Sequence, residues 1–459
     1  MKKYQIIILT TVLFVVLFYD EMLGINFGFF GIFMSCFTWY LTTERNRTRT
    51  FLMLFTISIL SSFAFMWFGD FASFLALVSS LFLLNLKSKT RNLKLYFVIP
   101  IVVSNAFTFM CRVFKFDQWL PQRKSGQFLQ KIIAFVAIPL ILVVAFFCVY
   151  TYGSDSFADL FTTFEWNINL FLLFGIAFLG FFIAFNYWNP AIEKVIYKIN
   201  HRLDEDFNSS EIRDNEGLGI LSIDFQRASG VVSLVVLNLL LLTFVITFNY
   251  EQFFDVKSQV NQLSGETHER VKAVVISIVM AIGVILYYFK SYFNFDEKAV
   301  WLKRLAITWL ILNAILILSA IIKNTEYILA LGLTYKRLGV YLFLSLSITG
   351  LIFSLIKIQK KKTNAFLLNK VPWMIYGVLL VCSFINWGKC VTLYNLSNKD
   401  FDWEYHLSDL NFNENELLEY AEISKDNKLK SDVLRRVENN QKESFLSKKV
   451  FYEMFKLKP

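Results

Sequence analysis

The chain has 459 residues, of which 56% are hydrophobic and only 18% are charged. This composition excludes an ordinary soluble protein, because so much apolar surface could not be kept in water. The net charge is +10, but the basic residues lie in short loops beside apolar runs, so retention of positive charge in the cytoplasm explains them and nucleic-acid binding is not expected. Five cysteines without paired spacing and three histidines give no reason to predict a disulfide framework, a metal or another cofactor.

Repeated apolar runs predict an all-α, polytopic membrane protein. Runs of roughly 16 to 22 residues suit helices that cross a hydrocarbon core about 30 Å thick. The first run has no small-residue cleavage site and is interpreted as a retained helix. About eleven crossings are predicted, at residues 4–19, 24–42, 51–69, 71–86, 132–152, 167–188, 231–250, 272–289, 304–322, 340–358 and 373–386.

Charge at the ends of the first four spans, in region 1–92, predicts a cytoplasmic N-terminus. Short acidic turns at Glu21 and Asp70 alternate with basic segments at residues 45–49 and 87–94. Lysine and arginine are retained on the cytoplasmic side, so the acidic turns are expected outside.

Region 93–131 is predicted to hold a re-entrant or interfacial segment and a basic cytoplasmic loop. Residues 93–111 are long enough to span but carry Pro100 and Asn105 near their centre, and basic residues flank both ends. A single crossing would place one basic end outside, which the charge rule disfavours.

Region 132–386 is predicted to be a seven-helix membrane core. Its loop 189–230, with an acidic run from Leu203 to Glu216, is placed in the cytoplasm, and its loop 251–271 outside. The lysine-rich segment 357–370 marks a further cytoplasmic loop.

Region 387–459 is near-neutral and is predicted to be a small soluble helical module on the non-cytoplasmic side. Asn413 and Glu416 have the spacing of a capping box before a helix. Apolar residues at helical spacing, Leu429, Val433 and Val437 and then Leu446, Val450 and Met454, predict two more short helices.

The stretch from Asn324 to Tyr341 is the main candidate site, because its basic residues are predicted to lie outside, where the charge rule does not explain them. An anion such as a lipid phosphate would be bound by Lys336 and Arg337, with Gly332 allowing close backbone approach and Thr334 capping the next helix. The alternative is that both basic side chains extend to the membrane interface at the start of a span.

Five further polar residues are weaker candidates. His268 and Glu266 could serve as a base or a metal ligand, but a surface histidine at a helix start is the simpler interpretation. Asp224 and Arg227 have the i, i+3 spacing of an ion pair at a span entry. Asn238 lies within an apolar run, where hydrogen bonding between helices is expected before a polar pathway.

Several stretches resemble a large family of bacterial polytopic membrane proteins known only as a conserved domain of unknown function. They are residues 138–161, 224–242, 264–282, Tyr327, Gly332 to Arg337, Gly339, the segment INWGKCVTLYNL (385–396) and the segment DWEYHLSDL (402–410). GLTYKR, at residues 332–337, is the most specific of them. In place of the family's usual acidic residue after Asn386 and Trp387, this chain has Gly388.

The resemblance implies an integral protein of the bacterial cell envelope and carries no established activity. We expect a non-enzymatic scaffold or binding component of the cytoplasmic (inner) membrane, with membrane lipids and other envelope proteins as partners. The absence of charged residues deep in the predicted spans favours this function over an ion-coupled transporter. The alternatives are a transporter or lipid-moving protein for an anionic substrate, and a membrane-embedded transferase acting on a lipid-linked substrate.

Overall fold

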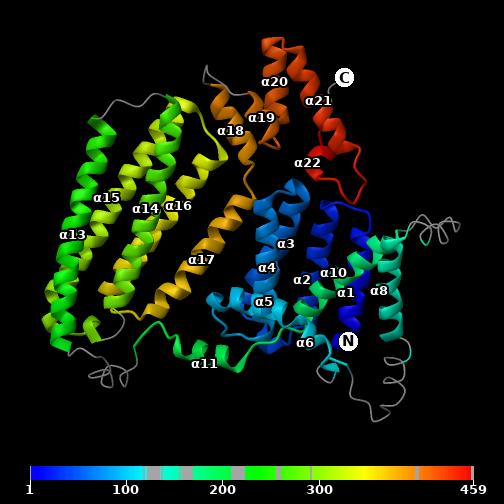
Figure 1. Ribbon diagram of the computed structural model, residues 1–459, viewed down its shortest axis with the longest axis horizontal. Helices are drawn as coiled ribbons and strands as arrows, with labels where there is room; N and C mark the ends of the chain where they lie inside the picture. Colours follow the sequence, from blue (N-terminus) through cyan, green and yellow to red (C-terminus); the bar gives the residue numbers. More distant parts are fainter. Residues whose placement is uncertain are drawn as a thin grey trace. The chain divides into compact units, whose positions relative to one another are not determined.

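The computed structural model describes residues 2–116, 119–120, 135, 138–154, 157, 169–207, 223–254, 260–289, 292–397 and 403–455. Its regular secondary structure in these ranges is entirely helical (Figure 1). Among the described residues, seven helices are long and apolar enough to cross a membrane: Arg49–Phe68, Phe71–Lys89, Leu170–Trp188, Asp224–Glu251, Glu297–Leu331, Tyr335–Gln359 and Asn364–Ser383. The predicted all-helical class is confirmed for the described residues, and these seven helices are compatible with a membrane protein, whereas the predicted count of eleven crossings is not confirmed.

The chain divides into two compact units that differ from the four regions predicted along the sequence. The first unit comprises Met1–Leu93, Phe97–Glu193 and Asn440–Pro459, and the second comprises Lys94–Tyr96 and Lys194–Asn439. The end of the C-terminal region therefore groups with the N-terminal helices.

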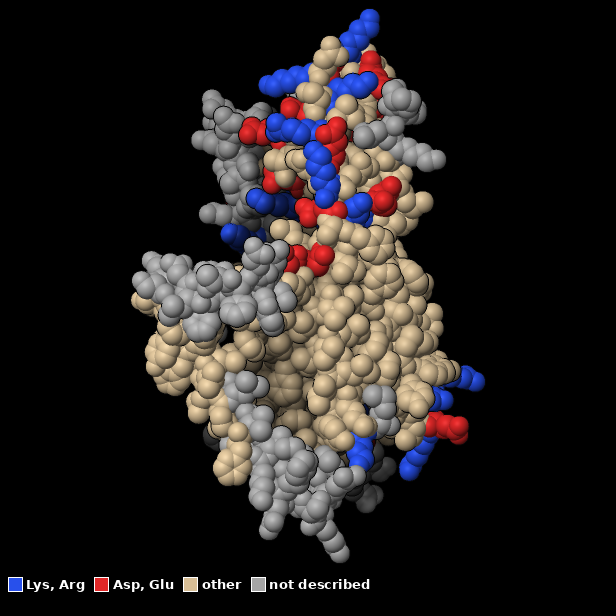
Figure 2. Space-filling model, turned by 90° about the vertical axis from the view of Figure 1, so that its right-hand side faces the viewer, with Lys and Arg blue, Asp and Glu red and all other residues tan. Residues whose placement is uncertain are grey.

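The first unit is a bundle whose core is rich in aromatic side chains. Phe14, Phe30 and Phe185 are buried in it, and α1 packs against α2 and α10 while α3 packs against α2 and α4. On the face in Figure 2, a broad area of the surface shows no charged side chain among the residues drawn in colour, as expected for a lipid-facing surface. The longer helices are α1 (Lys3–Phe18), α2 (Ile25–Leu41), α3 (Arg49–Phe68), α4 (Phe71–Lys89), α8 (Ile138–Gly153) and α10 (Leu170–Trp188).

The segment predicted to be re-entrant forms two short helices, α5 (Val98–Phe107) and α6 (Phe109–Val113), after the 3-10 turn η2 (Leu95–Phe97). The ten residues of α5 extend about 15 Å, half of what a crossing requires. Asn105 fixes α5 by donating to the backbone oxygen of Ala191 over 2.9 Å and accepting from its amide over 2.7 Å.

The last part of the chain binds the acidic turn between α1 and α2. The Glu21 carboxylate accepts hydrogen bonds from the hydroxyls of Ser444 and Ser447, and the amide of Met22 donates to the Ser447 hydroxyl over 2.8 Å. At Gly24 a Cβ would overlap the backbone oxygen of Ser447. The short helix α22 (Val450–Glu453) follows and packs on α3, so the predicted second tail helix is only four residues long.

The second unit contains five long helices, and the buried faces of the first four of them, α13 to α16, share one apolar core. Helix α15 packs against α13, α14 and α16, and α16 packs against α17. Asn238, on α13, donates to the backbone oxygen of Leu305 on α15 over 3.1 Å, which is the hydrogen bond between helices expected from the sequence. The helices are α11 (Lys194–Arg202), α13 (Ile223–Phe254), α14 (Val260–Tyr288), α15 (Val300–Leu331), α16 (Tyr335–Gln359) and α17 (Asn364–Ser383), with 3-10 turns η5 (Tyr292–Asn294) and η6 (Glu297–Ala299).

Helices α14 and α15 extend into segments that were predicted to be loops. Helix α14 begins at Val260, inside the predicted outer loop 251–271, and α15 continues to Leu331 through much of the predicted linker. No glycine or proline interrupts α15 before Gly332, and Lys323 pairs with Glu326 one turn later at 3.5 Å, so the polar residues continue the helix.

The acidic run after α11 lies against the lysine-rich segment that joins α16 to α17. Asp206 pairs with Lys362, and Glu205 with Lys370 at 3.7 Å. The backbone oxygen of Glu205 also accepts from the amide of Thr363 over 3.1 Å. The charge rule predicts basic residues in a cytoplasmic loop. The acidic residues here are explained by their ion pairs with lysines at the same end of the unit.

Within the described residues, four helices occupy most of the region that the sequence predicts to be a soluble module: α18 (Trp387–Leu396), α19 (Trp403–Ser408), α20 (Glu414–Ser424) and α21 (Asn427–Gln441). Leu417, Leu429 and Val433 are buried in its core, as the spacing in α21 predicts. The predicted capping box is wrong, because the Asn413 side chain makes no cap hydrogen bond and turns inward to the Thr392 hydroxyl at 2.8 Å, while Glu416 pairs with Lys389 at 3.0 Å.

Candidate functional site

The first three residues of GLTYKR form a turn between α15 and α16, and the last three begin α16. Gly332 has φ +78° and ψ 178°, a combination that essentially only glycine adopts, and a Cβ there would lie 2.9 Å from the side-chain oxygen of Asn395. The Thr334 hydroxyl accepts from the amide of Arg337 over 3.4 Å and so caps α16, as the sequence predicts. The turn is therefore shaped by specific residues over its whole length.

Arg337 is occupied by contacts within the protein. Its guanidinium donates to the backbone oxygens of Leu331 and Gly332, the former over 2.8 Å, and lies 4.1 Å from the ring centroid of the buried Tyr327. It thus neutralises the exposed carbonyl end of α15 and stacks on an aromatic ring. Lys336 is exposed, so it is the cation of this turn that is accessible to an external anion.

Asn395 of α18 connects the turn to the soluble module. Its side-chain oxygen accepts from the amide of Leu333 over 2.6 Å, and its side-chain nitrogen donates to the oxygen of the same residue over 2.8 Å. The same nitrogen lies 3.0 Å from Nε2 of His406, which is 1% exposed. Two segments 62 residues apart in the sequence are joined here by two partly buried hydrogen bonds.

The contacts of Asn395 determine the protonation state of His406. Because the Asn395 nitrogen donates, Nε2 of the imidazole must accept, and the ring proton lies on Nδ1, 2.9 Å from the hydroxyl of Thr392. Turning the amide over would break both of its bonds to Leu333. His406 is consequently a neutral structural residue, with Asn413 completing the network by donating to the same hydroxyl.

A second contact joins the turn to α19. The phenol oxygen of Tyr405 accepts from the amide of Tyr335 over 2.9 Å. Burial raises the pKa of the Tyr405 phenol, and this outweighs the Tyr335 amide and the nearby Arg337, which lower the pKa. The phenol therefore stays protonated at neutral pH and keeps its own proton to donate.

Gly388 lies where two backbone segments of the module meet. A Cβ at this position would overlap the backbone oxygen of Asn411, and the neighbouring Phe412 has φ +65°. The Asn386 side chain caps α18 by accepting from Lys389 over 2.9 Å and donates to the oxygen of Phe412 over 2.8 Å. The glycine permits this close approach, which a residue with a side chain would prevent.

The other predicted site residues whose side chains are described make their contacts elsewhere in the second unit. Asp224 and Arg227 form the expected ion pair at 2.8 Å, and Arg227 also binds the buried Asp296 at 2.7 Å, which ties α13 to the start of α15. His268 and Glu266 lie in the first half of α14, and their side chains are outside the described part of the structure. Within the described ranges, no group of three or more His, Cys, Asp or Glu side chains is placed to hold a metal ion.

Two buried cations were not identified as such in the sequence. Lys357 is 0% exposed and donates to the backbone oxygen of Phe289, at the end of α14, over 2.6 Å. Arg112 is also buried and donates to the side chain of Asn186 over 3.1 Å and to the oxygen of Asn189. Both cations lie in segments that the charge rule assigns to cytoplasmic loops. The number of charges in a segment does not show which of its lysines and arginines are buried.

A family model described as a domain of unknown function, DUF4153, matches residues 6–419. The chain belongs to this family. The match extends from α1 into α20 and includes the turn, α18 and α19, so every residue of the Asn395–His406 network that joins the module to the turn lies within it. Comparison with curated proteins gave no match, and comparison with solved structures gave none.

Proposed function

We propose that this DUF4153 protein is a non-enzymatic scaffold of the bacterial cytoplasmic membrane, which holds a folded helical module on the non-cytoplasmic face for recognition of another envelope component. The observation that carries the proposal is the network in which Asn395, held by the buried His406, fixes the module to the turn between α15 and α16 through two partly buried hydrogen bonds. A partly buried, specific attachment of this kind serves to orient a module, because a flexible tether would need none of these contacts.

We propose eleven crossings, of which seven are the long apolar helices. Four shorter apolar helices supply the others: Lys3–Phe18, Ile25–Leu41, α8 and the part of α14 from Lys272 to Tyr288. A helix of 16 residues extends about 24 Å, which local thinning of the bilayer accommodates at modest cost. The short helix α5 then remains as the re-entrant or interfacial element.

Contacts within each unit support the proposed sidedness. In the first unit, Ser444 and Ser447 of the C-terminal segment bind Glu21 of an acidic turn that the charge rule places outside. In the second unit, the acidic run at residues 204–206 meets the lysine-rich segment, which the same rule places in the cytoplasm. The proposed topology therefore agrees with both sets of contacts.

A cysteine at Ser424, an exposed residue at the end of α20, is expected to react with a membrane-impermeant maleimide in intact cells. The matched control is Lys360→Cys, exposed in the predicted cytoplasmic segment of the same unit, which should react only after lysis. Both variants are made in a chain whose native cysteines are replaced by serine. Labelling of Ser424→Cys only after lysis would overturn the proposed topology.

Complementation of a deletion strain separates the scaffold from an anion transporter. We expect Lys336→Gln, which removes the exposed cation of the turn, to restore the deletion phenotype, because a scaffold does not depend on it. Arg436→Met, which loosens the module, should fail to restore it at an equal amount of membrane-inserted protein. The reverse pattern, with Lys336→Gln inactive and Arg436→Met active, would favour the transporter and contradict the scaffold.

A further inference from the structure

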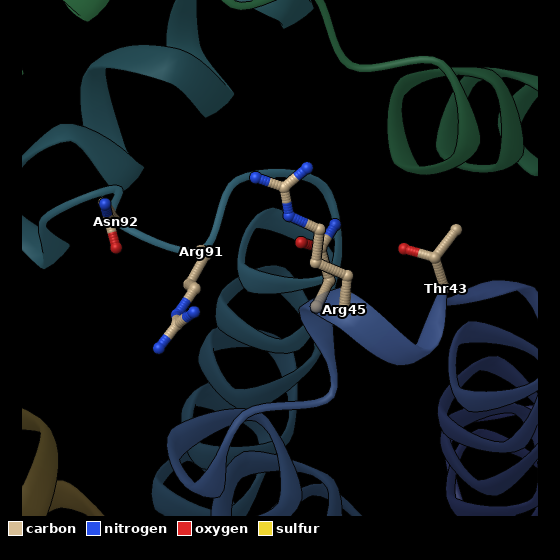
Figure 3. A pocket seen from close by; sticks show the side chains of 5 residues that line it. Thr43, Arg45, Arg91 and Asn92 are labelled. Carbon is tan, nitrogen blue, oxygen red and sulfur yellow. The ribbon is translucent and has the colours of Figure 1, made fainter.

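The first unit contains a polar pocket. It has a volume of about 590 Å³ and is lined by Thr43, Arg45, Asn46, Arg91 and Asn92. Figure 3 shows Arg45 and Arg91 on two adjacent loops, with Thr43 and Asn92 on either side. Volumes of 300 to 1,000 Å³ are common for small-molecule sites.

Both loops of the pocket are fixed by contacts that do not use the guanidinium groups of its two arginines. Asn46, at the end of the 3-10 turn η1 (Glu44–Asn46), donates through its side-chain nitrogen to the backbone oxygen of Ser88 over 2.8 Å. The Lys87 ammonium donates to the oxygen of Arg91 over 3.4 Å and to that of Leu93 over 2.5 Å. The walls are therefore held together across the ends of α2, α3 and α4.

The arginines of this region divide into two kinds. Arg47 is used by the fold, since it donates to the oxygen of Trp39 over 3.2 Å and lies 5.1 Å from the centroid of that ring. Within the described residues, the guanidinium groups of Arg45 and Arg91 form no ion pair or hydrogen bond, and no acidic residue lines the pocket. Two unused guanidinium groups in one pocket leave a local excess of positive charge.

We propose that this pocket binds the phosphate group of an anionic ligand, either a phospholipid headgroup or a soluble phosphate compound. Guanidinium groups bind phosphate through paired hydrogen bonds, and the hydroxyl of Thr43 offers a further donor. The pocket lies at the basic ends of apolar helices, the level at which anionic headgroups of the cytoplasmic leaflet occur. Positive-inside retention explains basic residues on this side, but it does not require two of them to line one pocket.

The test measures binding of phosphatidylglycerol to the purified full-length protein by native mass spectrometry from a neutral detergent, with phosphatidylcholine as the zwitterionic comparison. We expect the double variant Arg45→Gln/Arg91→Gln to bind phosphatidylglycerol about tenfold or more weakly than the natural chain, because two charge-assisted contacts are lost. The matched control Arg49→Gln removes an exposed arginine of the same region that does not line the pocket, and it should bind as the natural chain does.

Inorganic phosphate at millimolar concentration distinguishes the two sources of the anion. If phosphate displaces phosphatidylglycerol from the natural chain, the pocket takes soluble phosphate; if it does not, the ligand is the lipid. The variant Arg45→Lys/Arg91→Lys keeps the charge but loses paired hydrogen bonding, and it should bind phosphatidylglycerol with intermediate affinity. This result would show that weaker binding by the double glutamine variant does not come from a folding defect. The proposal would be overturned if a monodisperse double glutamine variant bound each of the two probes as tightly as the natural chain does.

Discussion

Replacement of Arg436 by methionine is expected to destabilise the soluble module by about 3 to 5 kcal/mol, the typical cost of removing one partner from a buried ion pair. Arg436, on α21, binds Glu414 at 2.7 Å, and that carboxylate is 0% exposed. Its guanidinium also donates to the backbone oxygens of Leu407 and Leu410, over 3.1 and 2.6 Å. Methionine keeps much of the apolar packing but leaves a buried carboxylate without this partner.

Limited proteolysis of the purified protein under native conditions measures the effect. Because cleavage of a transiently opened module follows the free energy of opening, a loss of 3 kcal/mol should raise the cleavage rate on the order of a hundredfold. Arg435→Met is the matched control, since Arg435 is the exposed neighbour on the same helix and its loss should change little. Equal cleavage rates for the two variants would show that the ion pair does not stabilise the module.

Alanine in place of Gly388 should separate the backbone segments that meet in the module. The added Cβ would overlap the oxygen of Asn411, and backbone cannot rotate aside as a side chain can. Overpacking of this kind costs about 1 to 3 kcal/mol, and the strained Phe412 at φ +65° leaves little room to adjust. We therefore expect a lower midpoint of thermal unfolding and faster proteolysis after α18.

Gly377→Ala provides the control for this substitution. Gly377 lies in α17, a Cβ there meets no atom within 4 Å, and alanine in a helix is intrinsically better than glycine. The control variant should unfold at the same or a higher temperature. A Gly388→Ala protein that also unfolds at the natural temperature would show that the module tolerates movement of the segment at Asn411.

The predicted helix ends agreed with the structure where they depended on local sequence signals, and they disagreed where they depended on distant contacts. The spans at α3 and α4 match the apolar runs, with Thr48 and Asp70 as caps. Helix α15 extended past its apolar run because polar residues without a breaker continue a helix. The capping box at Asn413 failed because a buried network competed for its side chain, which no local pattern reveals.

The prediction of site residues likewise succeeded for local features and not for contacts between distant segments. Thr334 caps α16 as predicted, since a helix cap depends on neighbouring residues, whereas the predicted approach of an anion to Gly332 stays a prediction. Arg337 was considered for an external anion, but the structure uses it on the end of α15, and no property of the residue itself decides between these partners. The resemblance segments containing Asn395 and His406 were recognised, yet their contact with the turn was not predicted.

By itself, the sequence determined that this protein is a helical membrane protein and where most of its helices lie, because burial in lipid depends on the apolar content of each continuous run. Only the tertiary structure decided which distant segments meet. It joined Leu333 to Asn395, the tail at Ser447 to Glu21, and the acidic run at Asp206 to Lys362. These contacts depend on the geometry and desolvation of particular polar groups, which no run of sequence specifies before the chain has folded.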